Sequence, residues 1–64
     1  MKKHRQHGKR VDAVEAARTR LMGKVRTAWI EGERTKPTFG HVEKQGRIYA
    51  LTARMGDTNL EEIV

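Results

Sequence analysis

Apolar residues recur every three or four positions in the first half of the chain. The stripe consists of Val14, Ala17, Leu21, Val25 and Ala28. This spacing corresponds to one face of an α-helix, so the pattern predicts an amphipathic helix over Val11–Glu31. Gly32 follows where a C-terminal glycine cap belongs. Gly23 interrupts the segment and leaves open a division into two helices, 11–22 and 24–31, although a single continuous helix is favoured.

Two segments of strand-forming residues come after a polar loop. Phe39–Glu43 and Arg47–Thr52 flank a short turn. Its glycine can adopt the positive φ that a tight hairpin turn requires, so the pattern predicts a β-hairpin. If Gln45–Gly46 is a two-residue loop, Val42 lies opposite Tyr49.

The chain ends in a short segment that has the spacing of a helix capping box. Thr58 precedes Glu61 by three residues, and Leu60 could pack together with Ile63 and Val64 in one helical turn. The expected fold is therefore α+β: a long N-terminal amphipathic helix, a β-hairpin and a short C-terminal helical turn. We expect residues 1–10 to form a flexible basic arm and residues 11–64 a single small domain.

The chain of 64 residues has no cysteine, which excludes a disulfide framework and a cysteine-ligated zinc site. A helix on a two-stranded hairpin leaves apolar surface uncovered. This favours a protein partner or self-association through the helix stripe as a homodimer. No apolar run approaches the roughly 20 residues that span a bilayer, and the basic N-terminus lacks the apolar stretch of a signal peptide. A cytoplasmic protein with no membrane partner is expected.

Charge is the strongest compositional signal, because 14 Lys and Arg against eight Asp and Glu give a net charge of +6. Basic side chains bind polyanions and release their counterions, which favours nucleic acid, and duplex DNA in particular, as the partner. A basic tail that only aids solubility is the alternative reading. The candidate contacts are five residues of the arm, two of the helix and two at the hairpin tip: Lys2, Lys3, Arg5, Lys9, Arg10, Lys24, Arg26, Lys44 and Arg47.

Little in the sequence indicates catalysis. His4 and His7 are three residues apart, but a metal site usually needs three or four ligands, and His41 would have to come from the hairpin. The chain has no serine and no glycine-rich phosphate loop. We expect no metal, no cofactor and no enzymatic activity. Trp29 follows the apolar stripe, so we expect it in the core rather than as a platform for stacked bases.

Parts of the chain resemble two families of phage and mobile-element proteins. Val25–Arg26, Trp29–Ile30, Gly32, Pro37 and Gly46–Tyr49 resemble the recognition helix and wing of excisionase-type winged helices. Those small phage and plasmid proteins bind DNA with the helix in the major groove and the wing on the backbone. The resemblance implies a DNA-binding protein with a helix-turn-helix, in which Ala16, Ala17 and Leu21 would belong to the first helix.

The second resemblance lies across the hairpin. Val42, Lys44, Gly46, Arg47, Thr52 and Ala53 are similar to the hairpin of the small head-completion protein of lambda-like phages, and Ala16–Arg18 and Leu21–Met22 are similar to the helix before it. That family has a helix-hairpin-helix order. It implies a phage protein. The alternative function, which the surplus apolar face would serve, is a protein–protein module that is either a phage head-assembly component or a small inhibitor of a host enzyme.

Overall fold

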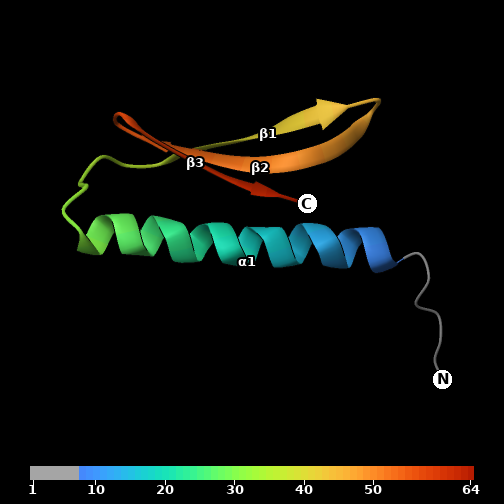
Figure 1. The fold of residues 1–64 in the computed structure, drawn as a ribbon, viewed down its shortest axis with the longest axis horizontal. Helices are drawn as coiled ribbons and strands as arrows, with labels where there is room; N and C mark the ends of the chain where they lie inside the picture. The colour runs from blue at the N-terminus through green and yellow to red at the C-terminus, as the bar shows by residue number, and fades with distance from the viewer. Residues whose placement is uncertain (1–7) are drawn as a thin grey trace, which may run out of the picture.

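The computed structural model describes residues 8–64, which form one helix and one antiparallel sheet. Helix α1 (Gly8–Ile30) is followed by strands β1 (Thr38–Lys44), β2 (Arg47–Met55) and β3 (Thr58–Ile63). The strands form a meander in the order β1-β2-β3, with β2 in the centre. Figure 1 shows the two layers, with the sheet lying along one side of α1. The expected α+β class with a hairpin is confirmed.

Helix α1 runs through Gly23 without a break, so the single-helix prediction is correct. It contains no turn of the kind that the winged-helix resemblance implies. Its end is a Schellman cap: the Gly32 amide donates to Trp29 O at 3.1 Å and the Glu33 amide donates to Ala28 O at 3.0 Å. Gly32 has a φ of 116°, a conformation that glycine adopts without the strain that a Cβ would impose.

The hairpin turn also forms as expected, since Gln45 and Gly46 have φ values of 54° and 76°, as in a type I′ turn. The predicted register fails beyond the turn. Glu43 pairs with Ile48, but Val42 pairs with Ala50 rather than Tyr49. A bulge at Tyr49 therefore adds one residue to β2 and shifts every pair beyond it.

The expected C-terminal helical turn is wrong, because this segment forms β3, paired antiparallel with β2 from Thr58 to Ile63. Gly56, with a φ of 61°, makes the tight connection between the two strands. A helix of one or two turns costs more to nucleate than its few hydrogen bonds return, whereas pairing with β2 satisfies the backbone along the whole segment. The structure therefore lacks the second helix that the head-completion resemblance implies.

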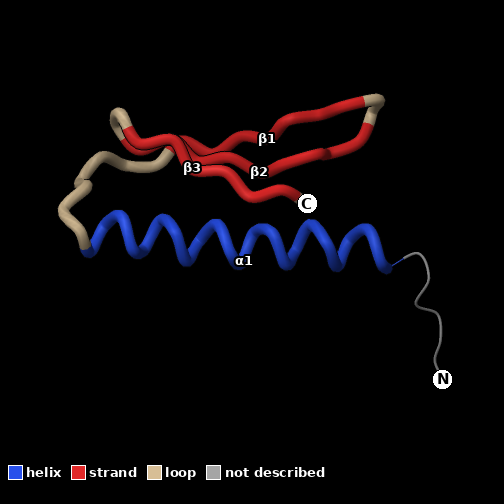
Figure 2. Tube along the Cα trace, in the orientation of Figure 1, coloured by secondary structure: helices blue, strands red, loops and turns tan. Residues whose placement is uncertain are grey.

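The core lies between α1 and the two strands that it contacts, β2 and β3. Figure 2 shows the three strands along one side of the helix. Among residues 12–64, five apolar side chains are buried: Ala17, Leu21, Ala50, Ala53 and Met55. Ala17 and Leu21, two residues of the helix stripe that we expected to mediate self-association, are thus enclosed within a single chain. Trp29, also expected in the core, is 45% exposed.

Within residues 8–64, no helix combines the length and the apolarity needed to cross a lipid bilayer.

Candidate nucleic-acid interface

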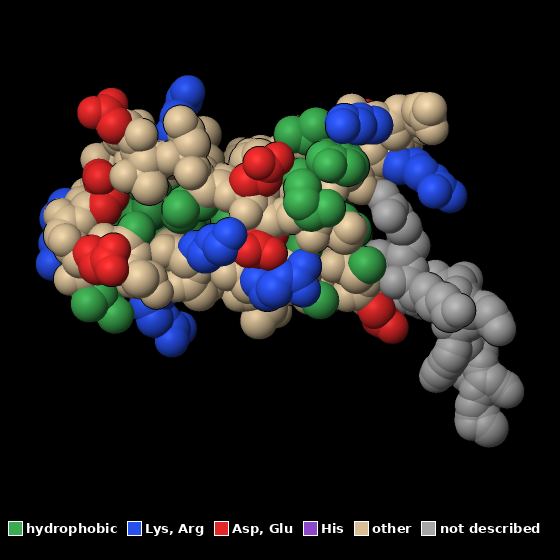
Figure 3. All heavy atoms as spheres, viewed as in Figure 1, with side chains coloured by type: hydrophobic (Ala, Val, Ile, Leu, Met, Phe, Trp, Pro, Cys, Tyr) green, Lys and Arg blue, Asp and Glu red, His purple; other side chains and the backbone are tan. Residues whose placement is uncertain are grey.

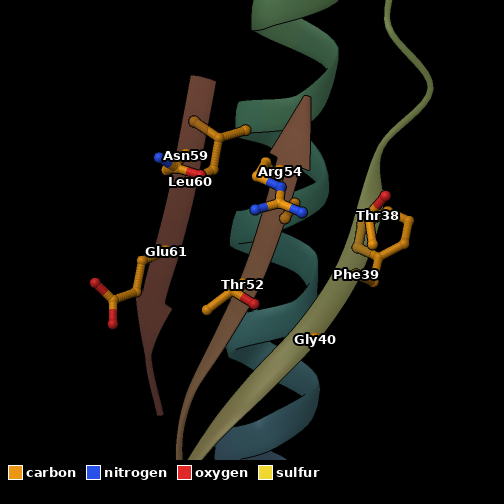
Figure 4. Close-up of a pocket in the computed structure, with 9 residues that line it drawn as sticks. Thr38, Phe39, Gly40, Thr52, Arg54, Asn59, Leu60 and Glu61 are labelled. Atoms are coloured by element: carbon orange, nitrogen blue, oxygen red, sulfur yellow. The ribbon is translucent and has the colours of Figure 1, made fainter. Parts of the chain in front are cut away.

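The sheet has one face against α1 and one face turned away from it, which we call the open face. Glu62 contacts α1, and side chains alternate along a strand, so Asn59 and Glu61 point to the open face. Figure 4 views the sheet from this side, with the helix behind the strands. Residues paired across strands share a face, which extends the open face over all three strands.

A shallow trough of about 390 Å³ crosses the open face. Its side chains come in two cross-strand rows, Thr38–Arg54–Asn59 and Gly40–Thr52–Glu61. Side chains pack closely around Gly40 in the trough, since an added Cβ would lie 3.1 Å from Thr52 Oγ1. Arg54 is the single long cation of the trough, and its neighbours in both rows are shorter side chains (Figure 4).

The basic hairpin tip lies at one end of the open face. Arg47 and Ile48 pair with β1 but not with β3, so this end of the hairpin is two-stranded. Lys44 Nζ lies 3.9 Å from the centroid of the Tyr49 ring, a cation–π contact. Figure 3 shows apolar side chains flanked by Lys and Arg at this end of the molecule. The tip therefore presents two cations and a half-exposed aromatic ring together, and it includes the expected contacts Lys44 and Arg47.

Two cations of α1 are engaged within the fold. Arg20 Nε lies 2.7 Å from Glu62 Oε1, and Lys24 Nζ lies 2.6 Å from Glu62 Oε2. The same side chains donate to backbone oxygens of β3, Lys24 to Glu61 O at 3.0 Å and Arg20 to Ile63 O at 3.1 Å. The hydrogen bonds from Lys24 and then Arg20 hold the pKa of Glu62 below its ordinary value. Lys24, one of the expected nucleic-acid contacts, thus joins α1 to β3.

The other expected contacts lie away from the open face or outside the described residues. Arg26 follows the buried Leu21 by five positions, about 140° around the helix, so it is on the outer side of α1. The backbones of Lys9 and Arg10 belong to the first turn of α1. Outside the described residues lie Lys2, Lys3, Arg5, His4 and His7.

The third histidine pairs with a carboxylate on its own strand. His41 Nε2 lies 3.2 Å from Glu43 Oε2, and both side chains are exposed. Over residues 8–64, no group of three or more His, Cys, Asp or Glu side chains has the geometry to hold a metal ion.

Arg54 was missed by sequence reasoning, which ended the second strand at Thr52. Continuing the alternation through Met55 would have placed Thr52 and Arg54 on one face and Leu51, Ala53 and Met55 on the other. Asn59 and Glu61 could not join them without the third strand.

No family model, curated protein or solved structure matches this chain.

Proposed function

We propose that this protein binds duplex DNA through the open face of its sheet. The observation that carries the proposal is the division of charge between the two faces. Over residues 8–64, carboxylate partners are present for Arg20 and Lys24, whereas Arg47 and Arg54 form no ion pair and Lys44 lies on an aromatic ring. Cations that are free of internal carboxylates can exchange their counterions for phosphates.

The shape of the tip supports the same function. The major groove of B-DNA admits a two-stranded β-ribbon, and the tip is a two-stranded ribbon with a cation on each strand. Lys44 and Arg47 pair directly across the tip, so both can contact phosphates at one edge of the groove. This mode of binding requires neither an enzyme's active site nor a cofactor. We propose a non-enzymatic cytoplasmic protein of phage or mobile-element type, in keeping with both resemblances.

The test is a titration with a 20-base-pair duplex at several salt concentrations. Neutralising Z phosphates makes the slope of log affinity against log salt about −0.9Z. Substituting both Lys44→Ala and Arg47→Ala should therefore lower the steepness by up to about 1.8. The comparison is Arg26→Ala with Arg47→Ala, because each removes one guanidinium and the two lie on different sides of the molecule. We expect Arg47→Ala to have the larger effect.

Two results would contradict the proposal. One is the absence of binding at low salt. The other is an equal loss of affinity in Arg26→Ala and Arg47→Ala, which would mean that net charge and not the open face determines binding.

We propose a smaller contribution from the basic residues that precede α1. Deleting residues 1–7 removes Lys2, Lys3 and Arg5 and leaves in place every side chain that is buried among residues 12–64. The steepness of the salt dependence should fall by up to about 2.7, while the thermal unfolding midpoint should not change. An unchanged slope would show that these three cations do not contact the duplex.

A second candidate function is protein–protein association. The observation that favours it is an open groove between α1 and β1. The groove is about 460 Å³ and is lined on the helix side by Leu21 and Met22 and on the strand side by Phe39 and Ile48. Phe39 is 53% exposed, because α1 packs on β2 and β3 and leaves β1 uncovered. An apolar groove beside a free strand edge favours strand addition.

We propose that the occupant is a second copy of this chain. Antiparallel pairing of two β1 strands about Val42 would place each His41 opposite the partner's Glu43, so opposite charges meet when His41 is protonated. Phe39→Glu should convert a dimer to a monomer in sedimentation equilibrium, whereas Ile30→Glu, 73% exposed at the end of α1, should not. A wild-type monomer at 100 μM would exclude the homodimer, and the head-assembly or host-enzyme inhibitor alternatives would then need another partner.

A further inference from the structure

The trough and the tip of the open face have different chemistry. The tip presents Lys44 and Arg47, two cations suited to phosphates. The trough presents one cation, Arg54, in a row with Thr38 and Asn59. Resting on the proposed DNA binding, we infer that the trough contacts base edges in the major groove, with Arg54 and Asn59 as the residues that determine sequence preference.

The dimensions of the trough agree with this role. Neighbouring strands lie about 4.8 Å apart, so the axes of three strands span about 10 Å, while the major groove is about 12 Å wide. Glycine at position 40 and the short Thr38 and Thr52 side chains keep the surface around Arg54 low. Because Arg54 is longer than its neighbours, its guanidinium can reach base edges in the major groove before the neighbouring side chains contact the walls of the groove.

The side-chain types match the hydrogen-bonding pattern of base edges. The fork of an arginine donates to O6 and N7 of guanine, and an asparagine pairs with N6 and N7 of adenine. Arg54 and Asn59 are directly opposite each other on adjacent strands, so they would contact neighbouring bases. Arg54 makes no ion pair within the described part of the chain, and its guanidinium is free for a base.

Glu61 distinguishes base contact from phosphate contact. It lies on the open face two residues beyond Asn59, about 7 Å along β3. A carboxylate there repels phosphates, but it can accept a hydrogen bond from N4 of cytosine. A surface for phosphates alone gains nothing from this carboxylate, whereas a surface that discriminates between bases does.

The geometry also selects DNA over duplex RNA. The major groove of A-form RNA is deep and too narrow for side chains on a sheet to reach base edges. Trough contacts are therefore available in B-form DNA only, although the cations of the tip would still attract RNA phosphates.

The experiment is a selection from a random 20-base-pair duplex library at 150 mM salt, followed by titration of the recovered duplex and of single-base variants. The wild-type protein should enrich a short motif containing guanine. Changing one contacted base should weaken binding by about 5- to 140-fold. Arg54→Lys is the matched variant because it keeps the charge and loses the fork. It should retain the salt slope and lose the preference for guanine.

The outcomes separate this inference from the DNA binding on which it rests. Salt-dependent binding without an enriched motif would overturn the trough inference alone. The same holds for a motif that is unchanged in both Arg54→Lys and Asn59→Ala. No binding to any duplex would overturn both proposals. Circular dichroism of each variant verifies that it is folded, and equal affinity for a duplex RNA of the recovered sequence would exclude contact through the DNA major groove.

Discussion

The two faces of the sheet use the same types of residue for different purposes. Toward α1, Arg20 and Lys24 converge on Glu62, whose side chain is only 15% exposed, and this one carboxylate pairs with both cations. On the open face, Lys44, Arg47 and Arg54 have no carboxylate partner within residues 8–64. Net charge alone does not separate these groups. The separation follows from Glu62, which faces α1 and pairs with the helix cations, whereas the cations of the sheet lie on the side turned away from the helix.

Apolar residues divide between the faces less completely, because Ala50, which pairs with Ile63 on the open face, is also buried. The helix-covered face buries Met55 completely, together with Ala53 and Leu21. On the open face Tyr49 and Ile63 remain 40% and 47% exposed. One face therefore holds the fold together, and the other is available for contact with a partner.

Among the variants that test this division between the two faces, Met55→Ala is expected to have the largest effect on stability. Removing a fully buried methionine side chain costs about 2–5 kcal/mol, and a domain of this size has a total stability of about 3–5 kcal/mol. The variant should be largely unfolded at 25 °C by circular dichroism. Ile63→Ala on the open face should lose only about 1 kcal/mol in urea unfolding, since half of its surface is already exposed. Equal losses would mean that the open face is part of the core.

Local signals were sufficient to predict the helix and the hairpin. Gly32 terminates α1 and Gly46 completes the β1–β2 turn, and each follows from a conformation that glycine adopts with little strain. The bulge at Tyr49 and strand β3 depend on contacts between distant segments. Glu62, for example, is placed by Arg20, 42 residues away in the chain, and nothing in the neighbouring sequence indicates that its carboxylate faces the helix.

In the candidate site, too, the sequence predicts the positions that depend on local signals and not those that depend on contacts between distant segments. Lys44 and Arg47 lie at the tip because a two-residue turn places its flanking residues there. The ion pair of Lys24 could not be predicted, because the sequence shows its charge but not its partner Glu62. The trough could not be predicted, because Arg54 and Asn59 meet only across strands whose pairing the sequence did not indicate.

A smaller effect is expected from Gly23→Ala, on a surface that belongs to neither face. An added Cβ at Gly23 has no atom within 4 Å, and a helical glycine is about 1 kcal/mol less favourable than alanine. The variant should therefore be more stable by about that amount in urea unfolding, with DNA affinity unchanged. Gly32→Ala is the control: its φ of 116° disfavours alanine, so this variant should be less stable than wild type. A loss of stability in Gly23→Ala would show that the helix needs flexibility at this point.

The smallest expected effect concerns the pH dependence of the helix-covered face. Lys24 and Arg20 lower the pKa of Glu62 from its ordinary value of 4.5, so the folded state holds this carboxylate ionised more strongly than the unfolded state does. The resulting stability is present above pH 4.5 and is lost as the pH falls through the lowered pKa. Both cations are half-exposed, so salt screens the interaction and the effect is modest.

Glu62→Gln isolates this contribution from that of Glu33, whose pKa is also lowered, by hydrogen bonds from Thr35. The variant should melt at a lower temperature than wild type at pH 7, and the difference between the two melting temperatures should shrink as the pH falls through the lowered pKa of Glu62. Glu61→Gln removes the same charge one residue away on the open face, where no cation pairs with it among the described residues. It should not lower the melting temperature at pH 7. If both variants lose the same amount, the carboxylates act through net charge, and the two faces of the sheet are electrostatically equivalent.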